Sequence, residues 1–452
     1  MMKLLRNGLC VLLLLLGLLA AVPAMAASQG LAIRDCHRVT LTKQDTTHDN
    51  DSVVRLWTAD TCLDSVDEEL ADISRAYVNA LGGDLPAAAN KTSGNSRLDV
   101  EIRYSRTGLT WMSFMVQARV TYHRDLMHQE MTTRTYDMTT GERILLTDIF
   151  PEDSEAWDIL AEAVRAEITE NFPEEATDLL ALYSVTGRQA LSEMDFTLHG
   201  MSLVLHIPAD RFYPEHHTLL EVTLMYPDIR PYMTEKAQTE TDNLTYYKTC
   251  ALTFDDGPSR TNSTLVLNAL MEGGARGTFF VIGNRIGEYA DLVQKEHDNG
   301  HAIGTHNWTH ANVTTVSATT LRGYKTKCDA AMTAAIGKPG TYDRVPYGLY
   351  PQMIKAKVGW PLIQWSLDTY DWRGKSSSEV LSTVKKQISD GDIILMHDIK
   401  DNTPGSTTAI INYLQEQGYI FLTVDELMAK DGVELKPNTV YYRCKDGDTS
   451  KK

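Results

Sequence analysis

From Tyr246 onward, short apolar stretches alternate with stretches of helical spacing, and this alternation limits the possible folds more than any other feature. The predicted strands are 250–254, 277–282, 302–305, 343–345, 362–367, 392–396 and 419–424. The predicted helices are 262–271, 291–296, 320–336, 378–389 and 408–417. Strands that alternate with helices favour a parallel sheet, and we expect it to be closed, or nearly closed, into a (β/α) barrel.

The chain has 452 residues, which is too long for one compact core, so at least two domains are expected. Residues 28–233 have the mixed pattern of an α+β accessory domain, and 246–445 form the alternating domain. In the first domain we predict helices at 65–81 and 157–168, strands at 98–104, 111–122, 196–206 and 219–226, and a hairpin around 137–141. Residues 234–245 are polar and aperiodic, which predicts a linker.

The N-terminus has the pattern of a signal peptide over residues 1–26. Lys3 and Arg6 precede the apolar run 8–22, and Ala24-Met25-Ala26 offers a small-residue cleavage site. An uncleaved anchor is the alternative, because the run approaches the roughly 20 residues that span a bilayer. Both interpretations place the protein outside the cytoplasm, secreted or at the cell surface, with membrane contact only through this segment if it stays uncleaved.

Net charge and cysteines limit the partners and the cross-links. The formal net charge of −17 argues against nucleic acid as a partner and against electrostatic binding to a membrane surface. Export permits disulfides, and the pairs Cys36–Cys62 and Cys250–Cys444 would each stay within one domain and leave Cys328 over. The five thiols that remain after removal of the signal peptide could equally be reduced, since spacing alone does not fix connectivity.

Polar side chains that can carry chemistry follow the predicted strands of the second domain. They are Asp255, Asp256, His306, Arg344, Asp368 and His397. The carboxyl ends of parallel strands meet at one edge of a sheet, so we expect these side chains to lie together. Asp255 and Asp256 end an apolar strand just before Gly257-Pro258, and a turn there can bring both carboxylates to one cleft.

Two histidines have the spacing of metal ligands. His306 and His310 are four residues apart and, with Asp256, would make a site of two histidines and one carboxylate. Three protein ligands leave a position open for water, as in catalytic metal sites. His297 and His301 have the same spacing, but a turn separates them, so we interpret His301 as a structural residue.

Five short motifs stand in order along this domain. They are Thr253-Phe-Asp-Asp-Gly-Pro258, His306-Asn-Trp-Thr-His310, Arg344-Val-Pro-Tyr-Gly348, Asp368-Thr-Tyr-Asp-Trp372 and Ile394-Leu-Met-His-Asp398. Their combination resembles the polysaccharide deacetylase family, carbohydrate esterase family 4. The resemblance implies a distorted (β/α) barrel and a metal-dependent hydrolysis of acetyl groups on a glycan.

The resemblance also implies roles for the residues that hold the metal and activate water. Asp256, His306 and His310 match the metal ligands, usually of Zn²⁺ or another divalent transition metal. Asp255 matches the general base that deprotonates water, and Arg344 matches the residue that holds this base. The family usually has Ser or Thr at the position of Asn307, and we expect Asn307 to brace the loop in its place.

The remaining motifs match the residues that bind and protonate the substrate. The backbone N–H of Tyr347 matches the donor to the oxyanion, and His397 the general acid for the leaving amine. Asp368 matches the carboxylate that orients this histidine, and Trp372 and Leu395 match the walls of the acetyl pocket.

The region ahead of the barrel narrows the choice of substrate. Residues 136–150 resemble a domain of unknown function that precedes the catalytic domain in some peptidoglycan deacetylases, and the whole chain is similar to peptidoglycan N-deacetylases of the PdaC type. This resemblance implies cell-wall glycan as substrate. The alternatives are a chitooligosaccharide or xylan deacetylase, or a catalytically silent wall-binding or sensing protein. Residues 28–233 are either a scaffold or a binding domain for wall glycan or a protein.

Overall fold

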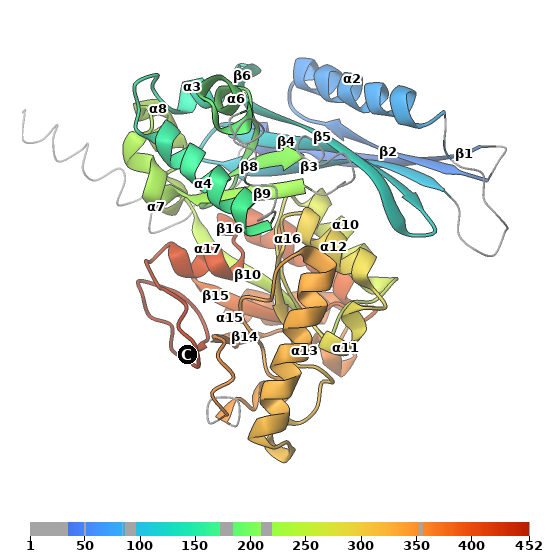
Figure 1. The fold of residues 1–452 in the computed structure, drawn as a ribbon, viewed down its shortest axis with the longest axis vertical. Coiled ribbons are helices and arrows are strands. Elements are labelled where there is room, and N and C mark those ends of the chain that lie inside the picture. Colours follow the sequence, from blue (N-terminus) through green and yellow to red (C-terminus); the bar gives the residue numbers. More distant parts are fainter. Residues whose placement is uncertain are drawn as a thin grey trace, which may run out of the picture.

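The computed structural model describes residues 35–48, 51–83, 85, 96–171, 184–208, 219–351 and 356–451. The predicted signal peptide therefore lies outside the described residues. Within the described ranges, no helix is both long enough and apolar enough to cross a membrane. Figure 1 shows the N-terminal part, in blue and green, lying against the second domain, in yellow to red.

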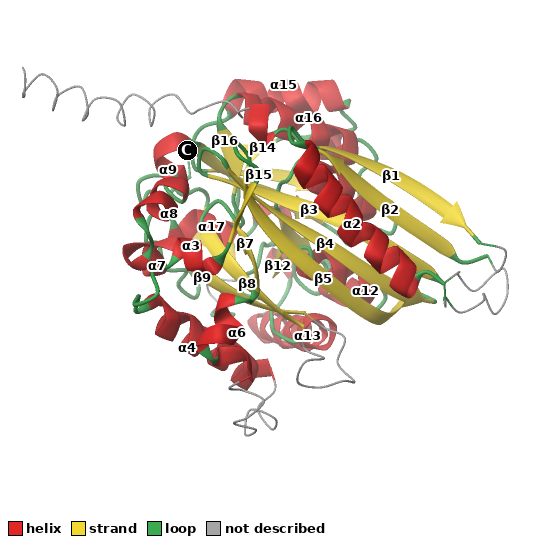
Figure 2. Ribbon diagram, turned by 90° about the horizontal axis from the view of Figure 1, so that it is seen from above, coloured by secondary structure: helices red, strands yellow, loops and turns green. Residues whose placement is uncertain are grey.

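A six-stranded sheet and one long helix build the first half of the N-terminal domain. The strands are β1 (Thr40–Thr47), β2 (Val53–Asp60), β3 (Arg97–Thr107), β4 (Trp111–Tyr122), β5 (Asp125–Asp137) and β6 (Glu142–Ile144), in that order across the sheet. Helix α2 (Asp64–Leu81) lies across one face (Figure 2), over buried Leu98, Val100 and Ile102 of β3. This confirms the predicted helix and strands, whereas β1 and β2 were not predicted.

A second, three-stranded antiparallel sheet completes this domain. It contains β7 (Asp195–Leu198), β8 (Ser202–Pro208) and β9 (Leu219–Met225) and shares a core with α4 (Ala156–Asn171). Short helices α3 (Leu146–Ile149), α6 (Arg188–Ser192) and α7 (Tyr226–Ile229) lie around it. The predicted strand 196–206 is in fact β7 and β8 joined by a turn, because Leu198 and Leu203 pair directly.

The segment predicted as the linker, residues 234–245, is partly helical. Its residues form the short helices α8 (Glu235–Glu240) and α9 (Asn243–Tyr246). Glu240 Oε2 accepts hydrogen bonds from the backbone N–H groups of Leu109 and Thr110 at 2.7 and 2.9 Å. Buried Asn243 accepts one from Gly108 at 2.8 Å. The polar side chains thus satisfy the β3–β4 turn instead of being solvated.

The second domain contains a parallel sheet, as predicted. Its strands run in the order β12 (Ala302–Thr305), β11 (Thr278–Val281), β10 (Lys248–Asp255), β15 (Asp392–His397) and β14 (Leu367–Asp368), and β16 (Tyr419–Phe421) pairs with the start of β10. A separate parallel pair joins β13 (Leu362–Ile363) to β17 (Val440–Tyr441). Among the described residues these pairings form no closed barrel, since the predicted strand at 343–345 makes only single bridges through Asp343.

Helices flank this sheet where the periodicity predicted them. They are α10 (Asn262–Glu272), α12 (Ala290–Asp298), α13 (Ala318–Ile336), α15 (Ser377–Gln387) and α16 (Thr403–Glu416). Helix α16 begins earlier than predicted, with Pro404 in its first turn, where the missing N–H costs no hydrogen bond. The short helices α11 (Gly283–Ile286) and α17 (Val424–Ala429) were not predicted.

The two domains contact each other through directed polar groups. Tyr104 Oη donates to the carbonyl oxygen of Glu272 at 2.7 Å, and Arg106 donates to that of Gly273 at 3.0 Å, both at the end of α10. Ser202 Oγ donates to the buried carboxylate of Glu426 at 2.7 Å. The N-terminal domain is therefore fixed to the helices of the second domain.

The five cysteines of the described residues are free thiols, which is one of the two alternatives that the sequence left open. Cys250 and Cys444 are buried free thiols, and Cys444 Sγ lies 3.4 Å from a carboxylate oxygen of Asp431. The thiol of Cys62 donates to the carbonyl oxygen of Cys36 at 3.5 Å instead of bonding to its sulfur. Burial raises the pKa of the Cys250 thiol and so keeps it protonated.

Candidate active site

The end of β10 places two adjacent carboxylates at one edge of the sheet. Asp255 is the last, buried residue of the strand, and Asp256 turns the chain with a φ of 75°. Successive strand residues would point to opposite faces, so this left-handed turn allows both carboxylates to face His306. Gly257 follows where a Cβ would overlap the Asp398 carboxylate, so only glycine fits there.

Arg344 holds Asp255 from below the sheet edge. Its guanidinium is completely buried, and Nη1 donates to Asp255 Oδ1 at 2.8 Å and to Thr253 Oγ1 at 2.7 Å. The other nitrogens donate to the carbonyl oxygens of Ile363 and Gln364 at 3.1 and 3.0 Å. These partners fix the guanidinium, and the guanidinium in turn fixes Oδ1 of Asp255. The other oxygen, Oδ2, lies 3.8 Å from Nε2 of His306. The predicted pairing of Arg344 with Asp255 is confirmed.

Asp256, His306 and His310 come together as the sequence predicted. One ligand atom from each lies within 4.8 Å of the others, and Asp256 Oδ1 is 3.5 Å from His306 Nε2 and 3.1 Å from His310 Nε2. His306 Nδ1–H donates to the carbonyl oxygen of Arg344 at 2.7 Å, which leaves Nε2 free as a ligand. Buried Asp256 Oδ1 makes no hydrogen bond of normal geometry, so this donor set fits a divalent transition metal.

The charge states of this cluster also suit a metal. Burial lowers the pKa of His306, so its imidazole stays neutral. Burial alone would raise the pKa of Asp256, but the neighbouring imidazoles of His310 and His306 lower it to about 2. A neutral imidazole and an ionised carboxylate are the forms that bind metal.

The loop between the two histidines is braced as expected. Asn307 has a φ of 61°, and its Oδ1 accepts a hydrogen bond from the backbone N–H of Trp308 at 2.7 Å. Its own N–H donates to buried Asp343 Oδ1 at 3.3 Å. The left-handed turn at Asn307 directs the chain back, so that His310 reaches the same carboxylate as His306.

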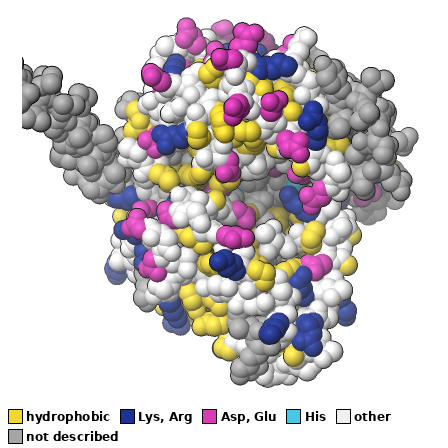
Figure 3. Space-filling model, turned by 60° about the vertical axis from the view of Figure 1, so that its left-hand side comes forward, with side chains coloured by type: hydrophobic (Ala, Val, Ile, Leu, Met, Phe, Trp, Pro, Cys, Tyr) yellow, Lys and Arg dark blue, Asp and Glu magenta, His cyan; other side chains and the backbone are white. Residues whose placement is uncertain are grey.

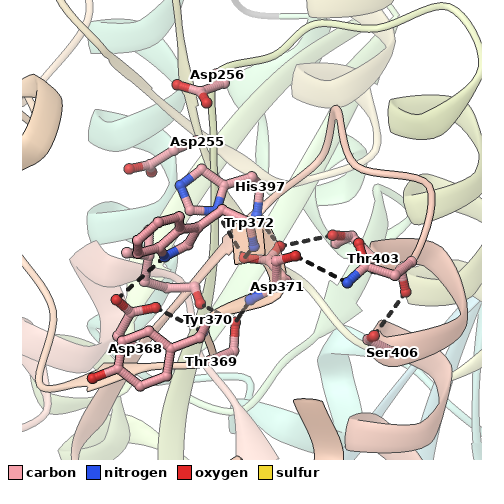
Figure 4. Close-up of polar contacts among 12 residues, drawn as sticks. Asp255, Asp256, Asp368, Thr369, Tyr370, Asp371, Trp372, His397, Thr403 and Ser406 are labelled. Atoms are coloured by element: carbon pink, nitrogen blue, oxygen red, sulfur yellow. Dashed lines mark hydrogen bonds and ion pairs between the residues drawn. The ribbon is translucent and has the colours of Figure 1, made fainter. Parts of the chain in front are cut away.

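Asp371, and not Asp368, orients His397, so the predicted assignment is wrong. His397 ends β15, and its Nδ1–H donates to Asp371 Oδ1 at 2.8 Å, while its backbone N–H donates to Asp371 Oδ2 at 2.7 Å. Figure 4 shows the imidazole between this carboxylate and the pair Asp255 and Asp256. Burial would lower the pKa of His397, but Asp371, with help from Asp255 and Asp256, raises it above the usual value. His397 is thus suited to donate a proton from Nε2.

Asp368 holds the loop that follows it. Its Oδ1 accepts a hydrogen bond from the Tyr370 backbone N–H at 2.8 Å, and its Oδ2 lies 3.5 Å from the indole Nε1 of Trp372. Burial raises the pKa of Asp368. Tyr370 takes a left-handed φ of 59°, which turns the next residues so that Asp371 points to His397 and Asp368 does not.

The three predicted substrate-contacting residues differ in exposure. Tyr347 is 63% exposed and has a φ of 61°, and its ring meets the edge of His310 at 4.8 Å between centroids. Trp372 is 45% exposed, whereas Leu395, two residues before His397 on β15, is buried. The predicted roles of these three residues in binding the acyl group stay predictions.

Three further residues, Asp371, Asp398 and Thr403, support the site and were assigned no role from the sequence. Thr403 Oγ1 donates to Asp371 Oδ2 at 2.7 Å from the start of α16 (Figure 4). Buried Asp398 accepts from Ser263 and adjoins Gly257, and burial raises its pKa to about 7. The motifs already contained Asp371 and Asp398, each directly beside a residue that was assigned a role. His301, by contrast, is buried and accepts from the Gly277 N–H at 3.2 Å, as a structural residue.

The comparisons with known proteins concern mainly the second domain. A family model described as polysaccharide deacetylase matches residues 243–359. The peptidoglycan-N-acetylglucosamine deacetylase PgdA of Listeria monocytogenes is 36% identical over 195 residues, which are 43% of this chain and 41% of that protein. The chain thus spans less than half the length of this relative. A peptidoglycan-N-acetylglucosamine deacetylase of Bacillus cereus is 34% identical over 38% of this chain and 68% of its own length.

One relative extends into the N-terminal domain. The peptidoglycan-N-acetylmuramic acid deacetylase PdaC of Bacillus subtilis is 26% identical over 320 residues, which are 65% of this chain and 68% of that protein. A solved structure of PdaC matches with a TM-score of 0.39 and 29% identity, over 40% of this chain and 91% of that chain.

Proposed function

This chain belongs to the polysaccharide deacetylase family, and from this premise we propose that it is a metal-dependent hydrolase that removes N-acetyl groups from cell-wall glycan. One observation carries the proposal: a three-ligand cluster, a fixed carboxylate and a histidine with a raised pKa face one another at the same sheet edge. Amide hydrolysis needs an activated water, stabilisation of the developing oxyanion and a proton for the leaving nitrogen.

The first two motifs supply the means to activate water. Asp256, His306 and His310 would hold the metal, and a bound Zn²⁺ or similar ion would polarise the acetyl carbonyl and acidify water. Asp255 accepts the proton of the attacking water through Oδ2, because Arg344 occupies its Oδ1. Arg344 also holds this carboxylate in place.

The other motifs act on the amide itself. His397 gives its Nε2 proton to the departing nitrogen, and Asp371 holds the imidazole by Nδ1 and favours its protonated form. The backbone N–H of Tyr347 donates to the oxyanion. Trp372 and Leu395 line the pocket for the acetyl methyl group.

The names of the relatives and the charges on the surface support the proposed substrate. Three relatives are named as peptidoglycan deacetylases, which favours wall glycan and action outside the cytoplasm. On the face in Figure 3, acidic side chains are interspersed with basic ones, as suits a polymer of mixed charge better than nucleic acid. We further propose that the parallel sheet is a distorted barrel, because single bridges at Asp343 join β12 to β13.

Acetate release tests the function directly. The metal-loaded full chain is offered peptidoglycan, N-acetylglucosamine oligomers and acetylated xylan in parallel, with Asp255→Asn as the inactive control. Release from peptidoglycan that the control lacks supports the proposal. Release only from the oligomers or from xylan would overturn the wall substrate but keep the chemistry. No release by a chain with bound metal would favour a wall-binding protein.

A further inference from the structure

A cleft of about 610 Å³ lies between the two domains, along helices rather than at the sheet edge that carries the candidate active site. The strands β2, β3 and β4 and the β4–β5 turn form one wall, and α10, α12 and the end of α13 form the other. The helices α10 and α12 lie below the long sheet in Figure 1. Half of the residues that line it are charged. Its central residues are Arg55, Arg97, Asp99, Glu101, Arg119 and Lys295.

The pleat of β3 explains why charges face this cleft. Its even-numbered residues from Leu98 to Tyr104 are buried in the core under α2, so Arg97, Asp99 and Glu101 point to the opposite side. Asp99 pairs across the sheet with Arg55 of β2 and Arg119 of β4. A row of alternating charges therefore crosses three strands and faces the second domain.

Two of the cations in this row already have partners. Arg55 donates from Nε and Nη2 to the two carboxylate oxygens of Asp45, both at 2.8 Å. Arg119 donates to Asp298 of α12 at 3.2 Å. The guanidinium of Arg55 stays 3.9 Å from Asp99, which is too far for a hydrogen bond.

Two buried carboxylate oxygens remain without a hydrogen bond. Glu101 is 4% exposed, and Lys295 donates to its Oε1 at 2.6 Å, but its Oε2 has no hydrogen-bond partner. Asp99 is 9% exposed, and its Oδ1 has none either. A buried carboxylate oxygen without a hydrogen-bond partner is costly, so a site of this kind favours a ligand that donates. Asp99 and Glu101 are two positions apart on the same face of β3, so one ammonium group can reach both.

Two arginines at the same cleft offer the opposite charge. Arg97 and Arg124 line it, and within the described part of the chain neither side chain makes a hydrogen bond or an ion pair. Arg97 lies two residues before Asp99 on β3, and Arg124 is in the exposed turn between β4 and β5. Guanidinium groups bind carboxylates through two parallel hydrogen bonds.

We propose that this cleft binds a short zwitterionic peptide, with a carboxylate on Arg97 and Arg124 and an ammonium group on Asp99 and Glu101. Residues two apart on a strand are separated by about 7 Å, which equals the distance between the ends of a peptide of two to three residues. A divalent metal fits less well, because Arg55 and Lys295 lie beside the same carboxylates. The assignment of this peptide to wall glycan rests on the proposed function. The binding of the free peptide to the cleft does not rest on it.

Calorimetric titration of the full chain with the tripeptide Ala-Glu-Lys tests this site. The comparison ligand is the same peptide with both amino groups acetylated and the carboxylates amidated. We expect the charged peptide to bind and the blocked one to bind roughly a hundredfold more weakly, since both charge-assisted contacts are lost. Addition of salt should weaken binding of the charged peptide.

Variants of the full chain assign the binding to this cleft. The double variant Arg97→Gln, Arg124→Gln and the single variant Asp99→Asn should each weaken binding roughly tenfold or more. Arg75→Gln, in an exposed pair on α2, is the matched control and should bind as the parent does. Thermal unfolding checks that each variant folds, and the double variant removes partly or fully exposed side chains only. No binding at millimolar peptide, equal binding of the blocked peptide, or an equal loss in Arg75→Gln would overturn the proposal. None of these results depends on acetate release.

Discussion

Replacing Asp371 by Asn should separate the role of this carboxylate from that of Asp368. Asp371 is completely buried and accepts hydrogen bonds from His397 Nδ1, from the His397 backbone N–H and from Thr403 Oγ1, at 2.8, 2.7 and 2.7 Å. Asn has the same shape but no charge, so the imidazolium of His397 loses the group that stabilises it most directly. The pKa of His397 should therefore fall toward or below its usual value.

The magnitude follows from the lost contact. A hydrogen bond to a charged group contributes about 1.5–3 kcal/mol, and about 1.4 kcal/mol corresponds to a tenfold change. We expect kcat/KM to fall roughly 10- to 150-fold at pH values above the pKa of His397, where the protonated form is scarce. The pKa of this histidine is raised in the folded enzyme, so its proton is retained at low pH and lost as pH rises. The basic limb of the pH profile should consequently move to lower pH.

The assay is the pH dependence of acetate release, together with an NMR titration of the His397 ring. Asp368→Asn is the matched control, because Asp368 contacts Tyr370 and Trp372 and not the imidazole. It should leave the basic limb in place, whatever it does to KM. A shift of the limb in Asp368→Asn, with none in Asp371→Asn, would refute the assignment.

Three shorter predictions concern the same sheet edge. Arg344→Met should lower the free energy of unfolding by about 3–5 kcal/mol in chemical denaturation, because it leaves the Asp255 charge buried without its partner; a loss below about 1 kcal/mol would contradict this. His306→Ala should weaken Zn²⁺ binding at least roughly hundredfold in calorimetry, more than loss of an outer-shell contact costs, and unchanged affinity would exclude the proposed ligand set. Gly257→Ala should lower the Tm, since its Cβ overlaps the Asp398 carboxylate; an unchanged Tm would show that this carboxylate can move.

Local patterns were sufficient for most of the secondary structure and for the metal cluster. The helix α2 and the strand β10 follow from spacing and from a terminating Gly-Pro, which act over a few residues. His306 and His310 come from one loop, so their approach to each other is also local. Asp256 joins them because parallel strands end at one edge, a rule that holds for the whole fold class.

The contacts of polar segments cannot be predicted from the sequence where their partners are distant in the chain. Residues 234–245 look like a solvated linker, yet Glu240 and Asn243 bond to the β3–β4 turn more than 130 residues earlier. The interdomain cleft is likewise invisible in the sequence, because its walls come from β3 and from α10 and α12. Composition records that a side chain is polar but not which backbone group it meets.

The sequence by itself determined the motifs, their order and the edge of the sheet at which they meet. Only the tertiary structure decided which carboxylate holds His397, because Asp368 and Asp371 stand in the same five-residue motif and are equally acidic. The left-handed turn at Tyr370 sends Asp371 under the imidazole and Asp368 toward Trp372. A backbone turn of this kind is fixed by packing against β15 and α16, and so by contacts that no local pattern encodes.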